Sequence, residues 1–462
     1  MKNSAQKRNR AIRLAVITSI ISKFGTVVLR LISIPIAIRL LGMDQFGVYA
    51  AITMAVGMID MLHIGIGPAL TRGIARAAAK GDRETERNLF TTGFLISSAL
   101  TVLLAGIFAC LLCSIPIPVL FGDKFASLEE PMLRASWIAL GIITIEMVCI
   151  ICDKARDGYL ETNYNNAWGA AGNILGAATL LAGIWFFPTI EFLILAINGS
   201  IALGKAGNSV HLFFQRTYLL PRFSNFKTSL IKTLACDGFR FSITYVLSAL
   251  VEYNAIAYLI GRTAGPEAVS VYQVLITIHF SLTGVVLMLT TPIWPALMDA
   301  HARGDGEWIR KAARKLYLLC PAFAVAVAIG LIIAGPWVIP LWTGDEFRNA
   351  VEAKFQLNRL TLAAFSGWFL FHIWRHINQV LVLGVGEMNA ASRTVIIESV
   401  LVVILAGSVL FSGGALAMIY GATAIGIASV SGWVYPLVFS RAIRKEAAES
   451  EQAAIPAIPS TG

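Results

Sequence analysis

The segment LAVITSIISKFGTVVLRLISIPIAIRLL, residues 14–41, is the first long apolar run of the chain and decides its fold class. At ~1.5 Å per residue, a helix over this segment extends about 42 Å, enough to cross an apolar bilayer core of about 30 Å. The segment nevertheless contains Lys23, Arg30 and Arg39. Because a cation at mid-membrane depth costs at least about 2.5 kcal/mol, these residues are expected to face a wet cavity or a partner.

Lys23 and Arg30 are predicted to share one face of this helix. They are seven residues apart, and at about 100° per residue the second side chain returns almost to the direction of the first. Arg39 follows Arg30 by nine residues, on the opposite face and near the helix end, where a snorkelling anchor is the simpler interpretation. Lys23 and Arg30 are therefore the first candidates for binding an anionic group.

The composition of the whole chain indicates an integral membrane protein. Hydrophobic residues make up 57% of its 462 residues and charged residues 14%, and the mean hydropathy is +0.72. Such a chain leaves little room for a soluble domain. Membrane proteins collect Lys and Arg in their cytoplasmic loops, so the excess of 37 Lys and Arg over 27 Asp and Glu does not require a nucleic-acid partner.

Polar and turn-rich breaks divide the chain into twelve predicted membrane spans. Their approximate ranges are 14–41, 45–71, 88–113, 132–153, 166–187, 191–214, 238–261, 267–298, 316–334, 356–383, 394–411 and 415–440. With this count, Lys and Arg concentrate at both termini and in every second loop. The opposite side holds only Lys124, Arg134, Arg262, Arg348, Lys354 and Arg359. The positive-inside rule therefore predicts that both termini are cytoplasmic.

Three motifs recur at an offset of 222 or 223 residues. They are LLGMDQFGVYA (40–50) with TAGPEAVSVYQ (263–273), AKGDRE (79–84) with ARGDGE (302–307), and LFGDKF (120–125) with WTGDEF (342–347). Each half then contains six spans, and an even number places the symmetry axis along the membrane normal with substrate between the halves. We expect an all-α integral membrane protein with twelve transmembrane helices in two six-helix lobes related by a pseudo-two-fold axis.

The repeat also predicts the domain organisation. An N-lobe is expected over 1–214, a cytoplasmic inter-lobe linker over 215–237 and a C-lobe over 238–445. The tail over 446–462, rich in Ala, Glu, Ser and Pro, is predicted to be disordered.

Motifs in both halves carry a resemblance to a known family. RLLGMDQFGVYA (39–50), GIGPALTRGIARAAAKGD (65–82) and TTPIWPALMDAHARGD (290–305), together with the basic start, resemble the polysaccharide flippases (O-antigen and exopolysaccharide type) of the multidrug/oligosaccharidyl-lipid/polysaccharide exporter superfamily. The resemblance covers all the predicted spans. It implies two lobes that move a polyprenyl-diphosphate-linked oligosaccharide, a polysaccharide repeat unit, to the outer leaflet of the bacterial cytoplasmic (inner) membrane by alternating access.

Further cations are predicted at or near membrane depth: Lys205, Arg240 and Arg375. With Lys23 and Arg30 they suit a diphosphate or an acidic sugar, because guanidinium and ammonium groups bind phosphate oxygens well. The alternative is that each cation is neutralised by a buried acid or snorkels outward.

Four residues are candidates for ion coupling or gating. Asp60 and His63 lie one helical turn apart and can carry H⁺ or bind Na⁺, although an Asp can equally neutralise a neighbouring cation. Glu146 and Glu252 are acids in other predicted spans. Under the 223-residue offset Glu252 aligns with the position before Arg30, which suggests a gating ion pair between them.

His279, His372, His376 and Trp374 are expected to line the cavity. His372 and His376 have the i, i+4 spacing of a two-histidine metal face, but Arg375 lies between them and would repel a divalent ion. We therefore predict a polar lining and no metal site. No Walker-type loop is present, so no nucleotide or other cofactor is expected and energy must come from an ion gradient, the membrane potential or downhill substrate use.

Other functions remain open from the sequence. A multidrug or cation antiporter of the same superfamily would need a pocket dominated by acids. A lipid II flippase typically has more spans than the twelve predicted here. A membrane polysaccharide polymerase would be an enzyme with a long outer loop, and no nucleophile and base arrangement is apparent, so we predict a transporter. A polymerase or glycosyltransferases of the same polysaccharide are the expected protein partners, and membrane lipid is the expected surroundings.

Overall fold

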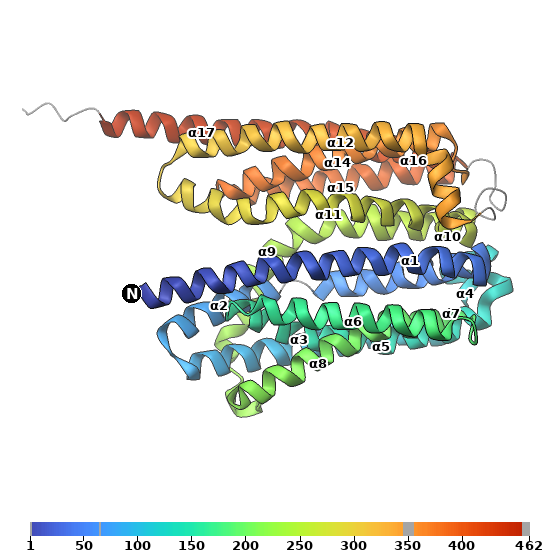
Figure 1. The fold of residues 1–462 in the computed structure, drawn as a ribbon, viewed down its shortest axis with the longest axis horizontal. Coiled ribbons are helices and arrows are strands. Elements are labelled where there is room, and N and C mark those ends of the chain that lie inside the picture. The colour runs from blue at the N-terminus through green and yellow to red at the C-terminus, as the bar shows by residue number, and fades with distance from the viewer. Residues whose placement is uncertain (1, 64–65, 345–354, 455–462) are drawn as a thin grey trace, which may run out of the picture. The chain divides into compact units, whose positions relative to one another are not determined.

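The computed structural model describes the backbone of residues 2–63, 66–344 and 355–454. Within these ranges, the side chains that are not described belong to residues 2–17, 19–23, 30, 59–63, 235–245, 291, 292, 295, 299, 302 and 446–454. All regular secondary structure in the described ranges is helical (Figure 1). The all-α prediction is confirmed for this part of the chain.

The chain divides into two compact units. The first unit contains Met1–Thr277 and Ile339–Ala353, and the second contains Ile278–Val338 and Lys354–Gly462. Two long helices, α11 (Pro266–Ala302) and α12 (Gly306–Thr343), contribute residues to both units.

The first unit is a bundle in which α1, α3, α5, α6 and α8 run along a common direction (Figure 1). Its elements before the linker are α1 (Lys2–His63), α2 (Ile66–Lys80), α3 (Arg83–Ser114), α4 (Ile117–Phe121), η1 (Asp123–Leu128), α5 (Glu129–Gly158), α6 (Thr162–Gly183), α7 (Ile190–Ile194), the π-helical turn η2 (Leu195–Gly199) and α8 (Ser200–Gln215). They are followed by η3 (Thr217–Leu219), η4 (Phe223–Asn225), α9 (Thr228–Ala249), the π-helical turn η5 (Leu250–Ala255) and α10 (Ile256–Ala264).

The second unit is a bundle of long helices. Besides its parts of α11 and α12, it contains α14 (Arg359–Gly384), α15 (Met388–Phe411), α16 (Leu416–Ser429) and α17 (Ser431–Ala454). Its core is aromatic: the rings of Phe365 and Trp368 on α14 lie 5.2 and 5.4 Å from the ring of Tyr420 on α16. All three side chains are almost fully buried, so these helices are held by apolar and aromatic packing.

Eight helices of the described chain are long and apolar enough to cross a membrane. They are Phe24–Met58, Arg83–Ser114, Asp123–Gly158, Ile190–Gln215, Pro266–Thr290, Gly306–Thr343, Met388–Phe411 and Leu416–Lys445. The predicted span 45–71 begins within Phe24–Met58 and continues into α2, and the remaining predicted spans fall in α6, in α9 to α10 and in α14. A multi-pass membrane protein is confirmed, whereas the count of twelve remains a prediction.

Helix α1 covers the predicted span 14–41 and most of the predicted span 45–71 without an intervening loop. Its backbone is kinked at Gly42, where φ is 80° and ψ is 169°. This kink lies between the predicted spans 14–41 and 45–71. Two bonds hold the first part of α1 on α6, because Asn166 and Asn173 donate to Thr18 and Thr26 at 3.1 and 2.8 Å.

The repeated motifs adopt matching backbone conformations. The φ angles are 80° and 94° at Gly42 and Gly265, 69° and 71° at Gly81 and Gly304, and 115° and 107° at Gly122 and Gly344. In the last pair, each glycine N–H also donates to the carbonyl of a proline four residues earlier, at 2.8 and 2.7 Å. Positive φ is a conformation that glycine adopts readily and other residues rarely, so these matches support the internal repeat.

Candidate functional site

Five of the predicted site residues lie outside the described side chains. They are Lys23, Arg30, Asp60, His63 and Arg240. Their backbones belong to the helices α1 and α9. Their roles in binding or coupling, and the Arg30–Glu252 gate, stay predictions.

Lys205 and Glu146 form an ion pair inside the first unit. Lys205 Nζ on α8 lies 2.6 Å from Glu146 Oε2 on α5, and the two side chains are 25% and 12% exposed. Both helices belong to candidate membrane spans. The sequence assigned the lysine to substrate and the glutamate to ion coupling, and the structure brings the two together in one pair.

The same interface between α5 and α8 continues as a polar network. Asp153 lies two turns beyond Glu146 and accepts from Asn208 Nδ2 at 2.5 Å. Asn208 is 1% exposed and also donates to Asn165 Oδ1 on α6 at 2.8 Å. The sequence analysis missed this network. The signal that was available is its helical register, since Asp153 is seven residues from Glu146 and Asn208 is three from Lys205.

A second network ties the start of the linker to α5 and α6. Arg216 binds Glu161 with two hydrogen bonds, of 2.6 and 3.0 Å, and the fully buried Arg156 reaches the same carboxylate at 3.2 Å. The Arg216 guanidinium also lies 4.1 Å from the centre of the Tyr159 ring. Burial opposes the charge of Arg216, but the hydrogen bonds and charge of Glu161 outweigh it and raise its pKa above the usual value.

Glu86 on α3 binds the linker at Tyr218. Its Oε2 accepts from Tyr159 Oη at 2.7 Å and from Tyr218 Oη at 2.6 Å, and the residue is 4% exposed. Tyr218 belongs to η3 of the linker. Burial, followed by the hydrogen bond to Glu86, raises the pKa of the Tyr218 phenol. The linker is therefore clamped to α3 and α5 by a shared carboxylate.

In the second unit, Arg375 is bound by a buried carboxylate. Its Nη1 lies 2.7 Å from Glu398 Oε1 on α15, with side-chain exposures of 6% and 1%. Its Nη2 bonds His372 Nδ1 at 2.9 Å. The sequence analysis missed Glu398, although it is the only acid in the predicted span 394–411. Arg375 was assigned to substrate, and its guanidinium is held by α15 in this structure.

The predicted histidines gather around this pair. The ring centres of His279 and His372 are 4.4 Å apart, and His279 lies 4.6 Å from the Trp368 ring. His376 Nε2 is 2.9 Å from Thr290 Oγ1. His279 and His372 are buried within the helix bundle of this unit, so the unit contains an extended titratable cluster.

Trp374 and Glu252 lie in different surroundings. Trp374 stacks on Tyr317 at 5.4 Å and donates to Gly432 O at 3.1 Å. It lines an apolar pocket of about 260 Å³ in the second unit. Glu252, in the first unit, is 2% exposed and belongs to the π-helical turn η5, where its backbone carbonyl accepts from Tyr272 Oη.

Among the described side chains, no group of three or more His, Cys, Asp or Glu is placed to hold a metal ion. Two cations of the predicted site are held in ion pairs, Lys205 with Glu146 and Arg375 with Glu398.

Sequence comparison decides the family. Residues 14–301 match the family described as "Polysaccharide biosynthesis protein". The chain belongs to this family. A relative in Escherichia coli (strain K12), named "Putative O-antigen transporter", is 25% identical over 368 residues, which are 76% of this chain and 78% of that protein.

Solved structures show the fold of this family member. An inward-facing multidrug resistance MATE family transporter of the MOP superfamily has a TM-score of 0.71 at 15% identity and covers 93% of this chain and 96% of its own. A MOP superfamily transporter from Pyrococcus furiosus Vc1 (DSM3638) has a TM-score of 0.65 at 14% identity, with 96% and 97% covered. This polysaccharide biosynthesis protein therefore has the same fold as these transporters.

Proposed function

We propose that the protein is a flippase for a polyprenyl-diphosphate-linked oligosaccharide, moving it from the inner to the outer leaflet of the bacterial cytoplasmic membrane by alternating access. The observation that carries the proposal is family membership over residues 14–301. The relative whose name gives O-antigen as its cargo supports the same substrate class. A glycan headgroup cannot cross lipid unaided because its polar groups lose water there, whereas a lipid tail can stay in the bilayer.

The headgroup diphosphate is assigned first to Lys23 and Arg30. Lys205 and Arg375 join it conditionally, because each is held by a carboxylate, at 2.6 Å from Glu146 and 2.7 Å from Glu398. A phosphate oxygen of the headgroup can replace the carboxylate as the partner of either cation. The proposed coupling ion, H⁺ or Na⁺, would then be taken up by the released carboxylate.

The proposed architecture has twelve spans in two six-helix lobes, with both termini in the cytoplasm. The matching φ angles of the repeated glycines support the repeat from which the lobes derive. Asp60, His63, Arg240 and Glu252 keep their proposed places near the path as coupling, binding or gating residues. The glycan would be received from glycosyltransferases and passed to a polymerase.

A multidrug or cation antiporter is the second candidate. The fold is shared with a multidrug resistance transporter, and the buried Glu146 and Glu398 are acids of the kind that bind cationic drugs. The same two acids also argue against it. Each is already paired with a cation of this chain, so neither pair carries a net negative charge.

Loss of the gene separates the two candidates. The proposed flippase predicts that lipid-linked oligosaccharide accumulates in the inner leaflet, where a membrane-impermeant glycan label reaches it in inside-out vesicles and not in spheroplasts. Expression of the wild-type chain should restore labelling in spheroplasts. An unchanged distribution of the glycan, combined with increased sensitivity to cationic drugs, would favour the antiporter.

A further inference from the structure

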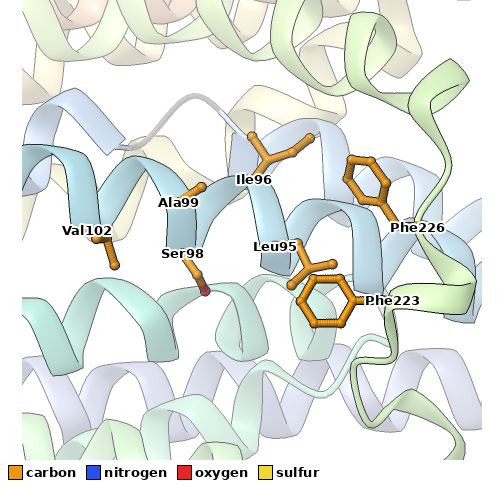
Figure 2. Close-up of a pocket in the computed structure, with 7 residues that line it drawn as sticks. All are labelled: Leu95, Ile96, Ser98, Ala99, Val102, Phe223 and Phe226. Atoms are coloured by element: carbon orange, nitrogen blue, oxygen red, sulfur yellow. The ribbon is translucent and has the colours of Figure 1, made fainter.

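An apolar groove lies on the surface of the first unit, between α3 and the linker. Figure 2 shows its lining, and its volume is about 720 Å³. The lining residues are Leu95, Ile96, Ser98, Ala99 and Val102 of α3 with Phe223 and Phe226 of the linker. The volume is that of a ligand-binding pocket, and apart from one hydroxyl its lining is apolar.

The groove opens where lipid is expected. Helix α3 is a candidate membrane span of which only 17% of the most apolar window is buried within the protein. At the rim, Phe223 is 86% exposed and Val102 67% exposed. Exposed apolar side chains within a span, such as Val102, and beside it, such as Phe223, favour contact with acyl chains over contact with water.

The linker is fixed in this position by bonds to α3. The backbone N–H of Lys227 donates to Thr92 Oγ1 at 3.0 Å, and Tyr218 donates to Glu86. These bonds hold the linker against α3, so both walls of the groove are fixed within the first unit.

Three cations lie close to the lining residues along the chain. Arg222 and Lys227 are exposed and flank the two linker phenylalanines in the chain. Arg87 precedes Leu95 by two turns on α3, about 12 Å along the axis. Among the described residues, none of these three side chains has a hydrogen-bond or ion-pair partner in the structure, and the buried Arg87 Nε is unsatisfied. An apolar groove beside cations without a bonding partner matches the apolar chains and the anionic headgroup of an acidic lipid.

We propose that this groove binds an anionic glycerophospholipid of the surrounding leaflet. One acyl chain lies against Leu95, Ala99 and Val102, and the headgroup phosphate is bound by the three cations. The lipid fills the space between α3 and the linker and holds Phe226 and Phe223 at the membrane surface. The proposal is independent of the transported cargo, because it uses no residue assigned to the headgroup path.

Photolabelling of the intact protein tests the site. The purified full-length chain is placed in phosphatidylcholine nanodiscs that contain a trace of phosphatidylglycerol with a photoreactive acyl chain, and labelled peptides are mapped. Labelling is expected on 95–102 and 223–226. Ala99→Trp fills the groove and should reduce this labelling at least about fivefold, because a ligand cannot share a filled site. Val102→Trp provides a second filled variant, and Ile174→Trp on the exposed face of α6 is the matched control.

Headgroup recognition is tested separately. Each cation near an anionic surface contributes a factor of about five, so R87Q/R222Q/K227Q should lower the preference for phosphatidylglycerol over phosphatidylcholine at least about tenfold. R314Q/K315Q, which removes exposed cations of α12, should not change it. Equal labelling by both phospholipids, or labelling unchanged in both filled variants, would overturn the proposal. Displacement by a polyprenyl diphosphate at lower concentration than by phosphatidylglycerol would also overturn it and assign the groove to the transported lipid.

Discussion

Gly81 and Gly304 occupy the same backbone conformation, with φ of 69° and 71°, and each is followed by an aspartate that caps the next helix. In both turns the aspartate N–H bonds the carbonyl five residues earlier, at 3.1 and 2.9 Å. In both, its carboxylate accepts from the backbone N–H three residues later, at 3.0 Å. Two segments 223 residues apart thus build one tight turn twice, as an internal duplication requires.

Alanine substitution at these two glycines should have equal effects. A Cβ at either site would meet no atom within 4 Å, so the whole cost is that of positive φ, about 1–2 kcal/mol. Both Gly81→Ala and Gly304→Ala should therefore lower the apparent melting temperature of the purified protein by similar amounts. Gly284→Ala, inside α11 and also without neighbours within 4 Å, should be neutral or stabilising. Unequal effects at the two turns would argue against equivalent conformations.

The sequence marked these two segments as a repeated motif between predicted spans, and the cause of the turn that they form is local. Gly-Asp between two apolar runs ends one helix and caps the next without help from distant residues. The helical class follows from equally local patterns of apolar residues. The division into compact units did not follow, because α11 and α12 each continue through a unit boundary that no sequence pattern marks.

The acid that pairs with each buried cation could not be predicted from the sequence. Lys205 and Glu146 are 59 residues apart, and Arg375 and Glu398 are 23 apart on different helices. Each cation was recognised as costly in a membrane, and neutralisation by a buried acid was one open alternative. Choosing the acid requires knowing which helices are neighbours, and helical periodicity specifies a face but not the helix that covers it.

The Lys205–Glu146 pair should respond to single and double substitution differently. Lys205→Met leaves a mostly buried carboxylate, with an expected loss of about 2–3 kcal/mol, somewhat below the value for fully buried pairs because Lys205 is partly exposed. The double variant K205M/E146M removes both charges and should recover most of that loss. The apparent melting temperatures of the wild type, Lys205→Met, Glu146→Met and K205M/E146M, measured in one detergent, give the coupling free energy between the two residues. A double variant whose loss equals the sum of the single losses would contradict the pair.

Arg375 should not tolerate lysine. Its two terminal nitrogens bind Glu398 and His372 at 2.7 and 2.9 Å, and a lysine ammonium cannot reproduce this planar fork. Arg375→Lys is expected to lose about 1.5–3 kcal/mol for one bond in a charged network. Arg393→Lys, at an exposed position of α15, is the control and should be neutral. Equal thermal stability of the two variants would show that the fork is dispensable.

The clamp on the linker should depend on Tyr218. Tyr218→Phe removes the 2.6 Å bond to buried Glu86, worth about 1.5–3 kcal/mol, and should speed tryptic cleavage at Arg222 and Lys227. Tyr258→Phe, which loses a bond to Leu120 O elsewhere, should leave cleavage of the linker unchanged. If the linker of the Tyr218 variant resists trypsin as the wild type does, the clamp does not hold it.

The same bond has a defined pH dependence. The pKa of Tyr218 is raised in the folded protein by burial and by Glu86. A raised folded pKa contributes stability that is fully present below the ordinary tyrosine pKa of about 10 and is lost as pH rises through the folded value. The difference in cleavage rate between wild type and Tyr218→Phe should therefore persist at neutral pH and shrink only in strong alkali.

The proposed flipping mechanism requires that cations of α1 bind the anionic headgroup. The direct measurement is outer-leaflet labelling of lipid-linked oligosaccharide in spheroplasts that express K23Q/R30Q at wild-type level, with R76Q/K80Q, which neutralises two exposed cations of α2, as the matched control. Two charge-assisted phosphate contacts of about 1.5–3 kcal/mol each predict a loss of at least about a hundredfold in labelling rate for K23Q/R30Q and none for R76Q/K80Q. Labelling at the wild-type rate in both variants would contradict headgroup binding by Lys23 and Arg30.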